Sequence, residues 1–254
     1  MHFPFKGRSK PRIQQLLDIA ATMTDIISTG YRMLDGLEEG TVTIDPSVLL
    51  LPVLGLINRC WNVDVQLQNF YQTLEEETSG PVYWPELSAG LEGIDDSEEL
   101  GKVFDVAFKY SDIQTARVCL FFWAISAMLW SGMAFVYRIL PGIQAVYSIR
   151  NGISPSKTSA QFELPPLGHR TDTATLARNI CKTIEFCSGD KYQGVGAGAV
   201  VFPLKVAIET LHDIPGCERE LLWAQAAMVR ISLGGLRMMS HLPVPMTDHA
   251  FLPA

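Results

Sequence analysis

The sequence between residues 172 and 242 constrains the fold of this chain most, because helix start and stop signals follow one another there in a fixed order. The order is helix, glycine-rich turn, helix, helix. The first helix is expected to open at Asp172 or Thr173 and to stop at Gly189. Its apolar face at helical spacing consists of Leu176, Ile180, Ile184 and Cys187. Each helix must bury such a face, so we expect the helices to pack together.

The two helices that follow have equally clear boundaries. One runs through Phe202 to a break at Pro215 and Gly216. The other starts on Glu218 and Glu220, whose charges suit the positive end of a helix dipole. Its spacing places four apolar residues on one side, which we expect to be its buried face: Leu222, Ala226, Val229 and Leu233.

The whole chain of 254 residues, 48% of them hydrophobic, is long enough to bury a large core. We expect an all-α fold, with no strand and no internal repeat. The predicted parts are a basic N-terminal tail (1–10), a helical region (11–148), a linker or disordered loop rich in proline and glycine (149–171), a C-terminal helical region packed on the first (172–242) and a tail (243–254).

Within the first helical region, two prolines at first-turn positions, Pro11 and Pro46, predict the starts of two long helices. The second of these is expected to end near residue 77, before an irregular loop at 79–99. Two more helices are predicted at 103–109 and 113–140, separated near Ser111 and Asp112, whose side chains suit a helix cap.

An uncharged run at 118–137 lies inside the last of these helices, between Arg117 and Arg138. Its length would suffice to cross a bilayer. Its tryptophans lie inside the run rather than at its edges, Ser126 and Ser131 interrupt it, and the neighbouring helices are amphipathic. We therefore favour a buried core helix and keep membrane association as the alternative.

The net charge of −7 argues against an independent nucleic-acid surface, because binding phosphates requires clustered Lys and Arg. One basic cluster is present, formed by Lys6, Arg8, Lys10 and Arg12. A solubilising tail is the favoured interpretation, with a nuclear import signal or a phosphate contact as alternatives.

The five cysteines contain no Cys-x-x-Cys pair and are interpreted as buried, reduced thiols: Cys60, Cys119, Cys181, Cys187 and Cys217. Their odd number and the absence of a signal peptide indicate a reducing, intracellular compartment.

Three strings resemble catalytic motifs, and each has a simpler interpretation. The acidic string at 95–99 fits a D-D-x-x-E metal signature, but its glycine-rich context favours a solvated loop. Glu209 and His212 have the Glu-x-x-His spacing of di-iron bundles, which need a second copy that this chain lacks. The glycines at 194–199 match a dinucleotide fingerprint without the strand that it requires, so close helix packing is favoured. We therefore predict no catalytic residue, no metal and no cofactor.

Several segments, in this order along the chain, resemble the regulatory region of fungal transcription factors of the zinc binuclear cluster class. They are LPVLGLINRCWNVDVQLQNFYQTL with the following GPVYW, then ICKTIEFC, the glycine-rich turn into VVFPLKVAIE, and RELLWAQ. They cover roughly half to two-thirds of the chain. The six-cysteine zinc module by which that family binds DNA is missing.

This resemblance implies a multi-helix bundle of the regulatory-domain type and a regulator without its own DNA-binding module. Such a protein would act on a secondary-metabolite gene cluster, in the nucleus, through an effector or through protein partners such as a full-length factor or co-regulator. The cytoplasm is the alternative location. Tyr83 and Trp84, in the loop at 79–99, are the candidate partner contacts.

A competing hypothesis is a cofactor-free enzyme or binding protein for a hydrophobic metabolite, of the cyclase or isomerase type. Its candidate apolar pocket consists of Phe122, Trp123, Trp130 and Met133. Large aromatics at helical spacing are more often plain core. A third reading is a nonfunctional relic of a former regulator.

Overall fold

A computed structural model describes residues 10–38, 46–91, 101–152, 164–192 and 194–233. These residues form a mostly helical protein with six α-helices and one two-stranded sheet. The helical expectation is therefore confirmed, and the expectation that no strand would occur is wrong. The acidic string at 95–99, most of the predicted basic tail and the tail at 243–254 lie outside the described residues.

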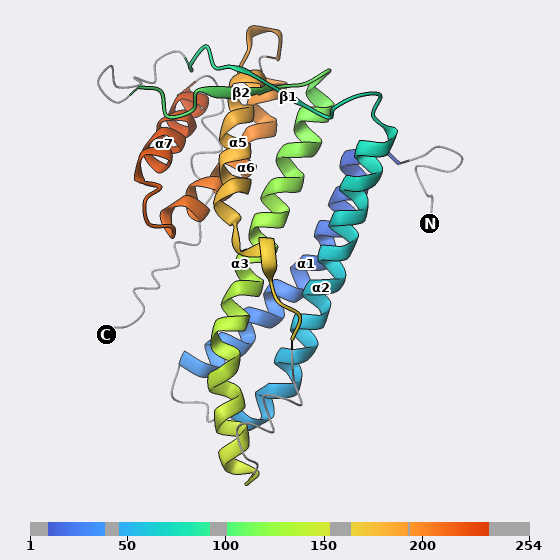
Figure 1. The fold of residues 1–254 in the computed structure, drawn as a ribbon, viewed down its shortest axis with the longest axis vertical. Helices are drawn as coiled ribbons and strands as arrows, with labels where there is room; N and C mark the ends of the chain where they lie inside the picture. The colour runs from blue at the N-terminus through green and yellow to red at the C-terminus, as the bar shows by residue number, and fades with distance from the viewer. Residues whose placement is uncertain (1–9, 39–45, 92–100, 153–163, 193, 234–254) are drawn as a thin grey trace.

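Three long helices form the elongated part of the molecule (Figure 1). They are α1 (Arg12–Glu38), α2 (Pro46–Glu77) and α3 (Ile113–Arg150). Helix α2 starts at the predicted Pro46, where a missing backbone N–H costs nothing, and α1 starts at Arg12, directly after the predicted Pro11. The backbone amides of Gln114 and Thr115 donate to Asp112 Oδ1 at 2.8 and 2.9 Å, so Asp112 caps α3 as predicted. Helix α3 ends ten residues later than predicted, because Pro141 lies within the helix rather than ending it.

The second half contributes α5 (Thr173–Cys187), α6 (Val195–His212) and α7 (Glu218–Leu233), in the predicted order. Helices α5 and α6 pack on each other and on the upper part of α3, and α7 packs on α6 (Figure 1). The predicted apolar face of α5 is buried, with Ile180 and Ile184 fully inaccessible to solvent.

The predicted buried face of α7 is wrong. Leu222 is 66% exposed and Val229 is 59% exposed, and Ala226 between them is exposed as well. The opposite side is buried instead, through Trp223, Ala224, Ala227 and Ile231. The Trp223 ring meets the Phe104 ring edge to face, with centroids 4.9 Å apart. The orientation of α7 thus follows its one large aromatic side chain rather than the more numerous aliphatic ones.

The sheet pairs β1 (Trp84–Leu87) with β2 (Val106–Lys109) in antiparallel register, with Trp84 opposite Lys109. The prediction of a helix at 103–109 is therefore wrong, and part of the predicted loop at 79–99 is a strand. Strand β2 lies against α5, and its Ala107 and Phe108 are buried. In so short a segment, this tertiary contact and the β-preferring residues Val106 and Phe108 outweigh helical spacing.

The uncharged run at 118–137 lies mostly inside the protein, with Cys119, Leu120, Ala124 and Ala127 fully buried. It is covered by α1 and α2 on one side and by α5 and α6 on the other. By length and composition alone, three helices in the described part of the chain are long and apolar enough to cross a membrane: α2, α3 and α6.

The glycine-rich turn before α6 has two distinct structural requirements. Gly194 adopts a φ of +78°, which favours glycine. At Gly196, a Cβ atom would lie 1.9 Å from the backbone oxygen of Cys187 at the end of α5. The close helix approach favoured for this motif is therefore what the structure has.

We expect Gly196→Ala to lower the free energy of unfolding by roughly 1 to 3 kcal/mol, because the added methyl group forces α5 and α6 apart. Gly198→Ala, in the same helical turn but with no atom within 4 Å of its Cβ position, should raise it by roughly 0.5 to 1 kcal/mol. Urea unfolding of both variants tests this, and equal effects would contradict it.

Candidate functional site

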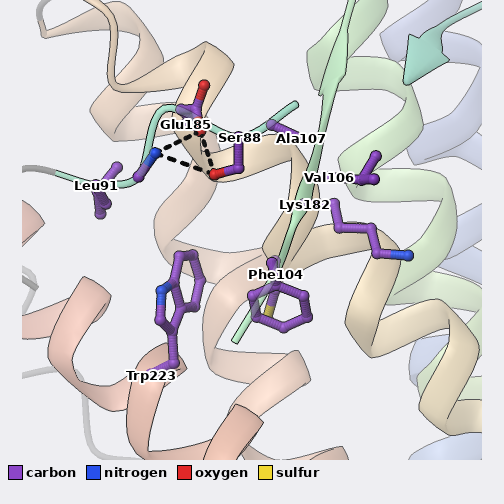
Figure 2. Close-up of a pocket in the computed structure, with 10 residues that line it drawn as sticks. Ser88, Leu91, Phe104, Val106, Ala107, Lys182, Glu185 and Trp223 are labelled. Carbon is purple, nitrogen blue, oxygen red and sulfur yellow. Dashed lines mark hydrogen bonds between the residues drawn. The ribbon is translucent and has the colours of Figure 1, made fainter. Parts of the chain in front are cut away.

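A small pocket lies where the sheet, α5 and α7 meet (Figure 2). Glu185 of α5 is its main polar group. Its Oε2 accepts a hydrogen bond from the Ser88 hydroxyl at 2.7 Å and one from the Gly90 amide at 3.3 Å. Its Oε1 pairs with Lys109 Nζ of β2 at 3.1 Å. The carboxylate thereby connects α5 to β2 through Lys109 and to the residues that follow β1 through Ser88 and Gly90.

The environment of Glu185 stabilises its charged form. Burial works to raise the pKa of this carboxyl, but the hydrogen bonds from Ser88 and Lys109, together with the Lys109 charge, outweigh it and hold the pKa below its ordinary value. Glu185 is thus a paired structural carboxylate, without the raised pKa that a general acid needs.

The size of this pocket limits what it can bind. Trp223 and Phe104 close one side, opposite Ser88 and Glu185 (Figure 2). Its volume of about 10 Å³ leaves space for about one water molecule. It is therefore too small for a metabolite.

A second, larger depression is an open groove of about 380 Å³ on the surface between α1 and α2. Six of its eight lining residues have polar or charged side chains, and its apolar members are Ile19 and Phe70. The lining residues are Arg12, Gln15, Asp18, Ile19, Gln66, Asn69, Phe70 and Thr73. The groove is open to solvent along its length and would leave a bound molecule largely exposed.

The four residues of the candidate apolar pocket are buried, and none lines either depression. Phe122 stacks on Tyr71 with ring centroids 4.5 Å apart, and Trp123 packs edge to face against Tyr83 at 5.5 Å. Trp130 donates a hydrogen bond to a buried carboxylate, and Met133 is 1% exposed. Neither of these two depressions therefore supports the pocket hypothesis.

The two candidate partner contacts have different surroundings. Tyr83 packs onto the body of the protein, against Phe108, Tyr110 and Trp123. Trp84 of β1 is 38% exposed, and its Nε1 donates to Glu86 at 3.2 Å. Of the pair, Trp84 alone offers a substantial surface to another molecule.

A second polar site, which the sequence analysis missed, surrounds Asp64 of α2. This carboxylate is fully buried. Its Oδ1 accepts a hydrogen bond from Trp130 Nε1 of α3 at 2.7 Å. Its Oδ2 accepts two from Arg170, at 2.8 Å from Nε and 2.6 Å from Nη2. Arg170 belongs to a short 3-10 helix, η1 (Gly168–Thr171), in the predicted linker.

Aromatic groups complete this site. The Arg170 guanidinium lies over the Trp61 ring, 4.5 Å from its centroid. Trp61 Nε1 donates to the Tyr137 hydroxyl at 2.9 Å, which in turn donates to the Pro165 carbonyl at 2.8 Å. The network therefore fastens the segment at 164–171 to α2 and α3.

A sequence signal for part of this network existed. Asp64 lies between Cys60 and Leu67 at helical spacing, on the face of α2 that is buried, so it was a candidate buried acid. Arg170 and Glu185 carried no such signal, because their partners lie far away in the sequence.

The remaining motifs have ordinary surroundings. His212 pairs with Asp213 at 3.1 Å between Nδ1 and Oδ1, and both side chains are exposed. Over the ranges that the structure describes, no three His, Cys, Asp or Glu side chains are grouped so that they could hold a metal ion. The five cysteines are buried and not disulfide-bonded, and burial raises the pKa of the Cys60 thiol to about 11.

No protein-family model, curated protein or solved structure matches this chain.

We expect Arg170→Ala to lower the free energy of unfolding by about 3 to 5 kcal/mol, because it leaves the buried Asp64 carboxylate without its cation. Arg59→Ala is the matched control, since its pair with Asp25 is exposed and should contribute at most about 1 kcal/mol. Similar losses in the two variants, measured by chemical denaturation, would contradict this account.

Glu185→Gln tests whether the negative charge of the Glu185 carboxylate stabilises the folded protein. Because folding depresses the pKa of Glu185, its stabilising contribution is present above its ordinary pKa of 4.5 and is lost as the pH falls through the folded value. The variant should therefore be less stable than the wild type at pH 7, with the difference shrinking toward pH 3. A difference that is constant over this pH range in urea titrations would assign the effect to packing instead.

Proposed function

We propose that this chain is a transcription-factor-like regulatory protein without its own DNA-binding module. It acts on a fungal secondary-metabolite gene cluster, in the nucleus, through protein partners or an effector. The resemblance of its α2, α5, α6 and α7 segments to the regulatory region of zinc binuclear cluster factors supplies the class. The partner we favour is a full-length factor of that kind.

The observation that carries this proposal is the exposed apolar face of α7, formed by Leu222, Ala226 and Val229. The two large side chains lie seven residues apart, about 10 Å along the helix, with the small Ala226 between them. This spacing fits the apolar face of another amphipathic helix. The face begins at Leu222 in the RELLWAQ segment, one of those that carry the resemblance, and Ala226 and Val229 follow that segment.

The two depressions described above favour contact with a protein partner over binding of a metabolite. Sites for small molecules typically enclose about 300 to 1,000 Å³. In the described parts of the chain, the pocket at Glu185 has room for about one water, and the groove between α1 and α2 is open to solvent. The cyclase or isomerase alternative would need a larger enclosed cavity.

Deletion of the gene in its native host, followed by measurement of transcripts and metabolites, tests the proposal. We expect transcripts of neighbouring cluster genes to fall. Unchanged transcripts, together with accumulation of an intermediate that the pure protein converts, would overturn the regulator in favour of the enzyme. If neither transcripts nor metabolites change, the protein would be a nonfunctional relic of a former regulator.

Complementation with variants locates the function on α7. The double variant Leu222→Asp, Val229→Asp should fold, because both side chains are exposed, yet fail to restore the transcripts. Val65→Asp on α2 is the control, since Val65 is also 52% exposed on a helix, and it should restore them. Full rescue by the α7 variant would exclude this face as the contact.

A further inference from the structure

The site around Asp64 has the composition of a receptor for a guanidinium group. Asp64 and Trp61 come from α2, and Trp130 and Tyr137 come from α3. They supply a buried carboxylate, an aromatic face and two polar groups that orient them. All four walls therefore belong to the long helices, and only the occupant, Arg170, comes from the segment at 164–171.

This segment is held on the surface by few contacts. Pro165, Pro166, Gly168 and His169 are exposed, and its regular structure is limited to the four residues of η1. Besides Arg170, its attachments are the hydrogen bond at the Pro165 carbonyl, partial burial of Leu164 and Leu167, and the His169 ring against Trp130, with centroids 5.3 Å apart. The segment is thus a strap, fastened chiefly by one charged side chain.

The burial of Asp64 determines how the strap can be released. Removing the cation that pairs with a fully buried carboxylate is strongly destabilising, and among the described residues Arg170 is the cation that pairs with Asp64. Lifting of Arg170 is therefore favourable only when another cation takes its place. Stacking on Trp61 and two N–H groups on one oxygen select a planar guanidinium over an ammonium group.

We propose that Asp64, Trp61, Trp130 and Tyr137 form a binding site for the arginine side chain of a partner peptide, with Arg170 as its intramolecular competitor. The site goes beyond the proposed function and does not depend on it, since the α7 face is a different surface. Arginine is recognised here by charge, by the plane of the guanidinium and by the carboxylate at the base of the site.

The test uses a synthetic peptide with the sequence of residues 164–172 added to the full chain, and the same peptide with citrulline in place of arginine. Arg170→Ala vacates the site, so it should bind the arginine peptide saturably and not the citrulline peptide. The wild type should bind the arginine peptide at least about tenfold more weakly, because the strap competes at a high effective concentration. Asp25→Asn, which removes an exposed carboxylate on α1, should leave binding unchanged.

Hydrogen exchange of the wild type keeps the proposal testable if Arg170→Ala does not fold. The arginine peptide should increase exchange at the amides of 164–171, and the citrulline peptide should not. Absence of binding to a folded Arg170→Ala variant would overturn the proposal. If that variant does not fold, unchanged exchange at 164–171 in the wild type with a large excess of the arginine peptide would overturn it, because Arg170 would then be a permanent structural clasp.

Discussion

The arrangement of this protein depends on α3, which is apolar on every side along its uncharged run. A helix of this kind must bury most of its surface, and in the run at 118–137 only a few residues, among them Met128, are exposed. Helices α1 and α2 cover one side, and α5 and α6 cover the other. The two parts of the chain therefore share one core. Within it, the Ser126 hydroxyl is the single buried side-chain polar atom without a hydrogen-bond partner among the described residues.

Local signals in the sequence predicted most helix boundaries. Pro11, Pro46, Asp112 and Asp172 each act through their own backbone geometry or a cap to amides two or three residues away, so no knowledge of the fold was needed. Strand β2 was missed because its conformation is decided by its contacts with α5 and β1. The buried side of α7 was missed for a related reason, since its orientation depends on Phe104, a residue more than a hundred positions away.

The polar sites, like β2 and the buried side of α7, depend on contacts between residues far apart in the sequence. Asp64 and Arg170 are separated by 106 residues, and Glu185 and Lys109 by 76, so no motif of fixed spacing contains either pair. The competing hypothesis placed the large aromatics of α3 in a pocket, although helical spacing favoured plain core, and in the structure Phe122 and Trp123 have other rings as neighbours. Composition and spacing correctly predict that an aromatic side chain is buried, but they do not distinguish a filled interior from a cavity.

The position of α3 in the middle of the chain has a consequence for synthesis. Helix α3 is complete at Arg150, whereas the helices that cover its second side end at Cys187 and His212. On the ribosome, an apolar helix with the length and composition of a membrane span is therefore finished well before half of its covering exists. The nascent chain, rather than the folded protein, is the form with the greatest exposed apolar surface, and it is the stage at which chaperones or membranes compete for this protein.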